Sequence, residues 1–128
     1  MTGKEYLSRI QYQMVVVDRL AEKLSAIKTI GTSHINENKI SSNHSGNIQR
    51  APESATVLYE SYSVQRDKLR AMQMDLIQLT ANINDNQIAT YLLRRYCNGQ
   101  SCDQIAKEMN HTVKWLENKS MVVLNDLL

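Results

Sequence analysis

The chain has 128 residues, of which 42% are apolar and 22% charged, and its formal net charge is +2. This composition is typical of one folded domain, or of a small domain with an added helical element, and it excludes disordered and collagen-like classes. One proline and four glycines argue against a turn-rich all-β fold, and the apolar runs, such as residues 14–17, are too short to span a bilayer. Because the first residues lack the apolar segment of a signal peptide, we expect a cytoplasmic protein with no membrane partner.

The first predicted element is a helix over residues 3–30. Thr2 and Glu5 have the spacing of a capping box, which marks a helix start. Apolar residues then recur three and four positions apart, at Leu7, Ile10, Met14, Val17, Ala21 and Leu24. A further group widens this stripe on one flank, which indicates a helix that meets more than one partner. Its members are Tyr6, Val16, Leu20 and Ile27.

Residues 31–53 are rich in Ser, Asn, Thr and Gly and show no period, so they are predicted to form a mobile loop. A second long helix is predicted over residues 53–83, because apolar side chains alternate four and three positions apart, with one polar interruption at Gln65. This stripe, which we interpret as the core of a hairpin or a dimer interface, consists of Leu58, Tyr62, Leu69, Met72, Leu76 and Leu79. The two helices predict an antiparallel helical hairpin over residues 1–83 that forms a homodimer.

Three shorter helices are predicted in residues 84–128. Asn84 and Gln87 again have capping-box spacing, so a helix begins near Asn84. The pair at residues 98–99, Asn-Gly, supplies a left-handed stop for that helix. Ser101 and Gln104 form a third capping box, which opens a short helix that ends near residue 109.

Residues 101–116 match the spacing of a helix-turn-helix unit. The first helix has an apolar residue followed by a small one, Ile105 and Ala106, where a second helix crosses closely. Asn110 suits a turn that needs a positive φ. Thr112 then caps the last helix, and Leu116 lies where a buried apolar residue is required.

Two segments resemble known families. The stretch Tyr91-Leu-Leu-Arg-Arg-Tyr-Cys-Asn-Gly-Gln-Ser101, followed by the Ile-Ala pair at residues 105–106, resembles region four of bacterial sigma factors. Over residues 2–30 and about 80–128, the chain resembles small phage transcriptional regulators of Gram-positive hosts, the ArpU/RinA-like group, whose Thr-x-Lys-Glu-Tyr-Leu start matches residues 2–7. The resemblance implies a phage regulator in the host cytoplasm that binds double-stranded DNA, with RNA polymerase or another regulator as a further partner.

The expected fold is therefore all-α, with a helical hairpin over residues 1–83 and a helix-turn-helix domain over residues 84–128. On the last helix, the residues expected to contact DNA bases are Val113, Lys114, Glu117 and Asn118. The residues expected to contact the DNA backbone are Arg94, Arg95, Lys107 and Thr112. Relatives usually carry several basic residues on the reading helix, whereas residues 84–128 of this chain hold five basic and five acidic side chains. We therefore expect weak DNA binding by a monomer and stronger binding by a dimer.

An alternative class remains open, in which the same helices bind another regulator or a host protein instead of DNA. No paired carboxylates, Ser-His-Asp pattern or phosphate-binding glycine loop occurs, so we do not expect an enzyme or a cofactor. Cys97, Cys102 and His111 do not have the spacing of a structural zinc site, and no fourth ligand is evident, so no metal is expected.

Overall fold

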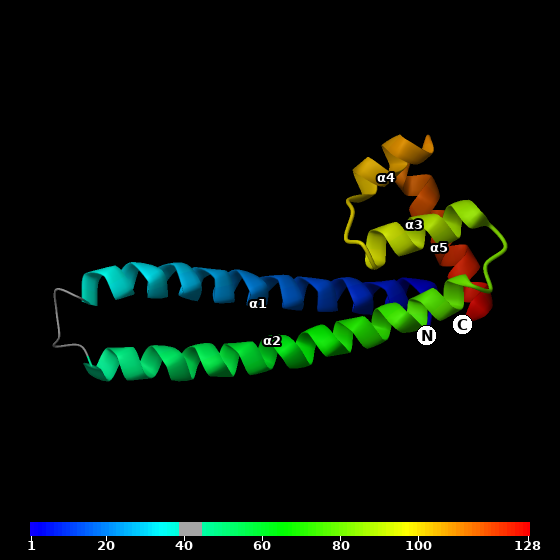
Figure 1. The fold of residues 1–128 in the computed structure, drawn as a ribbon. Coiled ribbons are helices and arrows are strands. Elements are labelled where there is room, and N and C mark those ends of the chain that lie inside the picture. The colour runs from blue at the N-terminus through cyan, green and yellow to red at the C-terminus, as the bar shows by residue number, and fades with distance from the viewer. Residues whose placement is uncertain (39–44) are drawn as a thin grey trace. The chain divides into compact units, whose positions relative to one another are not determined.

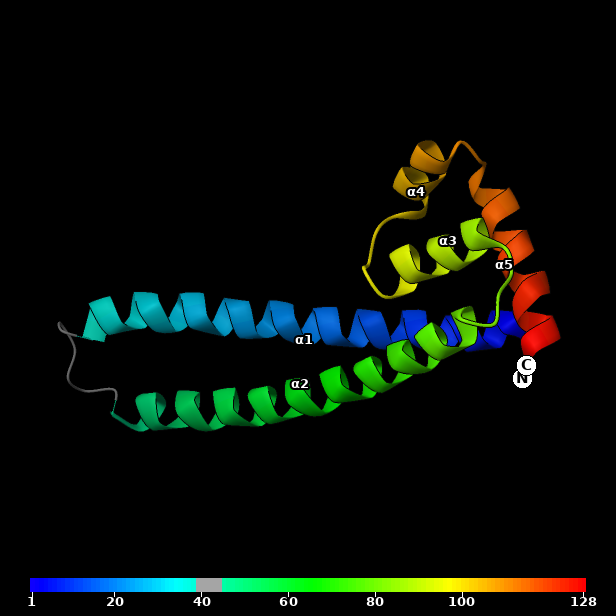
Figure 2. The same cartoon turned by 45° about the vertical axis from the view of Figure 1, so that its right-hand side comes forward.

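The computed structural model describes residues 1–38 and 45–128, and the side chains of residues 1–27 and 55–128. The described residues form five helices and no strand. These are α1 (Gly3–Asn38), α2 (Ser45–Thr80), α3 (Asn86–Tyr96), α4 (Cys102–Met109) and α5 (Val113–Leu127), shown in Figures 1 and 2. The all-α class expected from the sequence is confirmed. None of the described helices has a stretch long and apolar enough to cross a membrane.

The helix starts follow local capping chemistry. The hydroxyl of Thr2 accepts a hydrogen bond from the Glu5 backbone N–H (3.2 Å), as the capping box predicts. Ser101 accepts in the same way from the Gln104 N–H (3.2 Å). The cap predicted at Asn84 is one residue off, because the carboxylate of Asp85, rather than Asn84, accepts from the N–H groups that open α3. A carboxylate at this position also interacts favourably with the helix dipole, which explains the shift.

The predicted loop over residues 31–53 is shorter in the structure. Helix α1 continues to Asn38 and α2 begins at Ser45, so only residues 39–44 separate them, and these lie outside the described residues. Once a helix has nucleated, each added residue fixes only its own dihedral angles, and Ser, Asn and Thr disfavour this by only about 0.5 kcal/mol each.

The chain divides into two compact units, and α1 and α2 contribute to both. The first unit comprises residues 1–13 and 69–128, and the second comprises residues 14–68. Residues 69–83 therefore pack with the C-terminal helices, and the domain boundary expected between residues 83 and 84 stays a prediction.

The first unit holds most of the buried side chains described. Helices α3, α4 and α5 each pack against the other two. The fully buried aliphatic and aromatic residues of this unit are Ile10, Leu76, Ile88, Tyr91, Leu92, Ile105, Leu116 and Leu124. The first turn of α1 joins this core, because the Gly3 N–H donates to the Asn125 side-chain oxygen on α5 at 2.6 Å.

Two polar contacts attach α2 to its neighbours in the same unit. The Tyr6 hydroxyl on α1 donates to a carboxylate oxygen of Asp75 on α2 at 2.5 Å. The Gln73 side-chain amide on α2 donates to the Tyr96 carbonyl, at the end of α3, at 2.9 Å. A carbonyl at a helix end has no partner within its own helix, so Gln73 satisfies a group that would otherwise remain unpaired.

Candidate functional site

The turn between α4 and α5 is the most specific backbone feature of the first unit. Asn110 has φ 60° and ψ 38°, in the left-handed region, and its N–H donates to the Ala106 carbonyl. Asparagine tolerates this conformation better than most residues, as the sequence predicted. Thr112 then caps α5 by accepting a hydrogen bond from the Trp115 N–H at 3.1 Å. The turn and its cap thus fix where α5 begins relative to α4.

Helix α5 has one buried and one exposed face. Its buried side chains are Leu116, Ser120 and Leu124. The side chains expected to contact bases lie mainly on the other face, because Lys114, Glu117 and Asn118 are exposed while Val113 is half-buried. The structure therefore presents three of the four expected base-contacting side chains together on one helix.

The charge on α5 is balanced. Lys114 and Lys119 are exposed, and so are Glu117 and Asp126, so the helix carries no net charge. Non-specific affinity for DNA comes mainly from neutralised phosphates. The exposed face of α5 therefore carries polar side chains that could reach base edges, but it has little net attraction for the phosphates of a DNA backbone.

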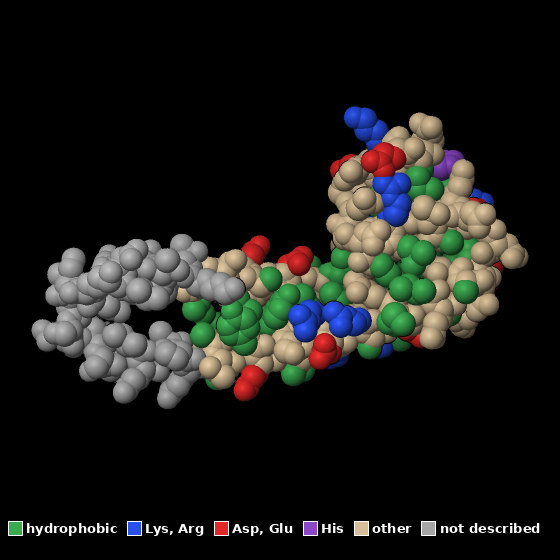
Figure 3. All heavy atoms as spheres, in the orientation of Figure 1, with side chains coloured by type: hydrophobic (Ala, Val, Ile, Leu, Met, Phe, Trp, Pro, Cys, Tyr) green, Lys and Arg blue, Asp and Glu red, His purple; other side chains and the backbone are tan. Residues whose placement is uncertain are grey.

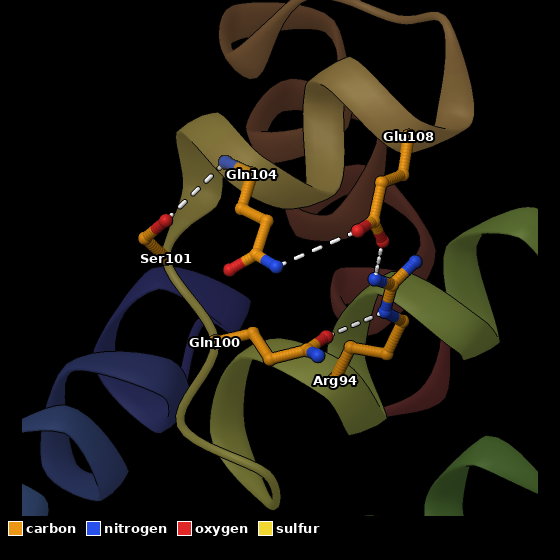
Figure 4. A network of polar contacts seen from close by, with 5 residues as sticks. All are labelled: Arg94, Gln100, Ser101, Gln104 and Glu108. Atoms are coloured by element: carbon orange, nitrogen blue, oxygen red, sulfur yellow. Dashed lines mark hydrogen bonds and ion pairs between the residues drawn. The ribbon is translucent and has the colours of Figure 1, made fainter.

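Among the residues expected to contact the DNA backbone, Arg94 is engaged inside the protein. Its guanidinium forms an ion pair with Glu108 on α4, and its Nε donates to the Gln100 side-chain oxygen at 2.6 Å. Gln104 donates to the other oxygen of Glu108 at 3.5 Å, and Figure 4 shows how these side chains converge between α3 and α4. Only 23% of the Arg94 side chain is exposed, and its ion pair with Glu108 joins α3 to α4.

The other three expected backbone contacts differ in exposure. Arg95 is half-buried, with one guanidinium nitrogen 3.4 Å from the Gln100 carbonyl and its guanidinium carbon 5.8 Å from the centre of the Tyr96 ring. Lys107 and Thr112 are exposed. Lys107 is therefore the one basic side chain of this set that extends into solvent.

A small polar and aromatic cluster fixes the turn before α5. The rings of His111 and Trp115 are stacked, with centroids 3.9 Å apart and an interplanar angle of 10°. The His111 Nε2 lies 3.0 Å from the side-chain oxygen of Gln87 at the start of α3. This cluster ties the beginnings of α3 and α5 to each other.

Both cysteines are free thiols that face neighbouring protein groups. Cys97 lies 3.9 Å from the Gln73 carbonyl, and burial raises its pKa, so it stays protonated at neutral pH. Cys102 lies 3.6 Å from the Tyr91 hydroxyl. In the described part of the chain, no three His, Cys, Asp or Glu side chains gather in a way that could hold a metal ion.

The stripe expected to form the hairpin core or the dimer interface is only partly buried. Leu76 has no exposed surface, whereas the other five members are half-buried. These are Leu58, Tyr62, Leu69, Met72 and Leu79. On the face shown in Figure 3, hydrophobic side chains lie along the described seam between α1 and α2, with charged side chains of both signs beside them.

The sequence did not predict which side chains hold the candidate site residues in position. Glu108 and Gln100 hold Arg94, and Gln87 holds His111. The one usable signal was the opposite charge of Arg94 and Glu108 on adjacent predicted helices, because no periodic pattern relates residues fourteen positions apart on two helices.

Comparison with known proteins adds no assignment, because no family model, no curated protein and no solved structure matches the chain.

Proposed function

We propose that α4 and α5 act as a helix-turn-helix unit that binds double-stranded DNA, with α5 as the reading helix. The observation that carries this proposal is the left-handed turn at Asn110 followed by the Thr112 cap, which leaves Lys114, Glu117 and Asn118 exposed on one face. Asn118 is suited to pair with adenine, Glu117 to accept from cytosine, and Lys114 to reach guanine or a phosphate.

The proposed biological role is that of a phage-encoded transcriptional regulator. It rests on the resemblance of residues 2–7 and 91–106 to small phage regulators and to region four of sigma factors. Because α5 is neutral, binding of one copy should be weak, and a homodimer that engages two half-sites compensates for this. The half-buried stripe of α2 is compatible with self-association of the helical hairpin.

The decisive experiment is a titration of promoter-region duplex DNA, followed by fluorescence anisotropy at several salt concentrations. Lys114→Ala should weaken binding and make the salt dependence shallower, since one phosphate or base contact is lost. Asn118→Ala should relax the preference at one base pair by roughly 1–3 kcal/mol. Lys119→Ala removes the same charge from another side of α5 and serves as the control. Absence of salt-sensitive binding to any duplex by the folded protein would refute the proposal.

A second candidate function is an interaction protein that binds another regulator or a host protein through the same helices. Two observations favour it, namely the balanced charge of α5 and the engagement of Arg94 by Glu108. Under this alternative, Lys114→Ala or Glu117→Ala abolishes binding to a protein partner while no DNA binding is detected.

A further inference from the structure

His111 is the last residue before the cap of α5, and contacts with three helices fix its position. Its ring stacks on Trp115 of α5, with centroids 3.9 Å apart and planes 10° apart. Its Nε2 atom lies 3.0 Å from the side-chain oxygen of Gln87 on α3. Its backbone N–H donates to the Ala106 carbonyl on α4 at 3.1 Å. His111 is nevertheless only half-buried, so part of it remains accessible to a ligand.

The hydrogen bond to Gln87 determines which nitrogen of the ring takes up a further proton. A carboxamide oxygen can only accept, so the Nε2 atom of His111 carries a hydrogen and donates it to Gln87. In the neutral ring the other nitrogen, Nδ1, is then unprotonated, and protonation at Nδ1 leaves the bond to Gln87 intact. The face of the Trp115 indole is electron-rich and attracts a cation. The neutral and the charged imidazole therefore both fit the same position.

The charged side chains around this cluster have both signs. Those within four positions of His111, Gln87 or Trp115 are Asp85, Lys107, Glu108, Lys114, Glu117 and Lys119. The carboxylate of Asp85 accepts from two N–H groups that open α3, and Glu108 pairs with Arg94. Glu117 follows Trp115 by two positions, which places it on another side of α5. The three carboxylates are thus directed elsewhere, so an anion that pairs with a charged His111 would come from a ligand.

We propose that His111, in its charged form, contacts a phosphate of the DNA that α5 binds, so that DNA binding takes up a proton. This inference rests on the proposed function, in which Lys114 and Asn118 reach base edges. His111 directly precedes the first turn of α5, and the first turn of a reading helix lies close to the DNA backbone. The positive end of the α5 dipole disfavours a charged ring in the free protein but attracts a phosphate.

The consequence is a DNA affinity that depends on pH. Imidazole is the side chain whose charge changes between about pH 5 and pH 8. One imidazolium adds one positive charge at the start of a helix whose own charges cancel. DNA binding should therefore be strongest where the ring is charged, and it should weaken as the pH rises and the ring loses its proton.

The test is a titration of promoter-region duplex DNA with the full-length protein, followed by fluorescence anisotropy at constant ionic strength. For the wild-type protein, we expect affinity to be about three- to tenfold higher near pH 5.5 than near pH 8. The salt dependence should be steeper at the lower pH by about one released ion, since one more phosphate is neutralised. Calorimetry in two buffers of different ionisation enthalpy should show proton uptake on binding.

Three variants assign the effect to this ring. His111→Gln cannot become charged, so it should bind as weakly at low pH as the wild-type protein does at high pH. His111→Arg carries a permanent charge and should bind tightly over the whole range. His34→Gln removes another imidazole of the chain and is the matched control, which should keep the wild-type pH dependence.

The outcomes separate this inference from the proposed function. DNA binding by the wild-type protein that does not change with pH, or an unchanged pH dependence in His111→Gln, would overturn the inference and leave the proposed function standing. Absence of binding to any duplex at any pH would overturn both. Affinity of His111→Arg that still falls as the wild-type affinity does would also overturn the inference, and this variant tests it even if circular dichroism shows that His111→Gln does not fold.

Discussion

The two compact units of this protein are built from the same two long helices but differ in how much they bury. In residues 1–13 and 69–128, the helices pack in several directions, and side chains such as Ile88, Leu92 and Leu116 have no exposed surface. In residues 14–68, Val17 and Leu24 are the buried hydrophobic residues of the described part, each with 7–8% exposure. The same two helices therefore contribute to a closed core in one unit and leave more apolar side chains accessible to water in the other.

The largest expected effect is a loss of stability, and it should differ between two leucines of the same stripe on α2. Leu76→Ala should lower the free energy of unfolding by about 2–5 kcal/mol, because it leaves a cavity in the closed core of the first unit. Leu58→Ala, at a half-buried position of the second unit, should cost less than about half of that, since water can reach the space. Urea unfolding followed by circular dichroism measures both. Similar losses for the two variants would mean that the units are equally well packed.

A smaller effect is expected at the first turn of α1. A Cβ atom on Gly3 would lie 2.9 Å from the Leu124 Cβ and 2.9 Å from the Met121 carbonyl oxygen, which is closer than Cβ atoms approach other heavy atoms in proteins. Gly3→Ala should therefore destabilise the protein by about 1–3 kcal/mol, although alanine favours helices. Ser8→Ala, at an exposed position of α1, is the control. A higher melting temperature for Gly3→Ala would show that the start of α1 does not pack on α5.

The smallest effect at neutral pH concerns the Tyr6–Asp75 hydrogen bond. Tyr6→Phe should cost up to about 1 kcal/mol, because this hydrogen bond is exposed and water competes for both partners. Burial, and then the hydrogen bond to Asp75, raise the pKa of Tyr6 above its ordinary value near 10. A raised folded-state pKa contributes stability below pH 10 that is lost as the pH rises further.

Unfolding measured between pH 8 and pH 12 checks this dependence. The wild-type protein should lose stability above about pH 10, and Tyr6→Phe should lose less over the same range. Burial also raises the pKa values of Tyr91 and Tyr96, so part of the alkaline loss should remain in the variant. An identical pH dependence for both proteins would contradict the assignment to Tyr6.

Much of the first unit could be predicted from the sequence because its determinants are local. A cap such as Thr112 acts on an N–H three residues away, and the left-handed turn at Asn110 depends on one residue. The exposure of Lys114 and Asn118 follows from the buried position of Leu116 on the same helix.

Other features could not be predicted because they depend on distances between helices. The ion pair between Arg94 and Glu108 joins two helices whose crossing is set by packing, so a solvent-facing role for Arg94 was the natural expectation from sequence. The lengths of α1 and α2 were underestimated, because residues of low helix propensity cannot be distinguished from a loop by periodicity alone.

The hydrogen bond between Gly3 and Asn125 spans 122 positions of the chain, which has a consequence for biosynthesis. At the usual rate of translation, roughly 5–20 residues per second, the first turn of α1 waits on the order of ten seconds before α5 has been made. During that time Leu7 and Ile10, which are buried in the finished protein, have no core to enter. The nascent chain is therefore expected to be a substrate for ribosome-associated chaperones.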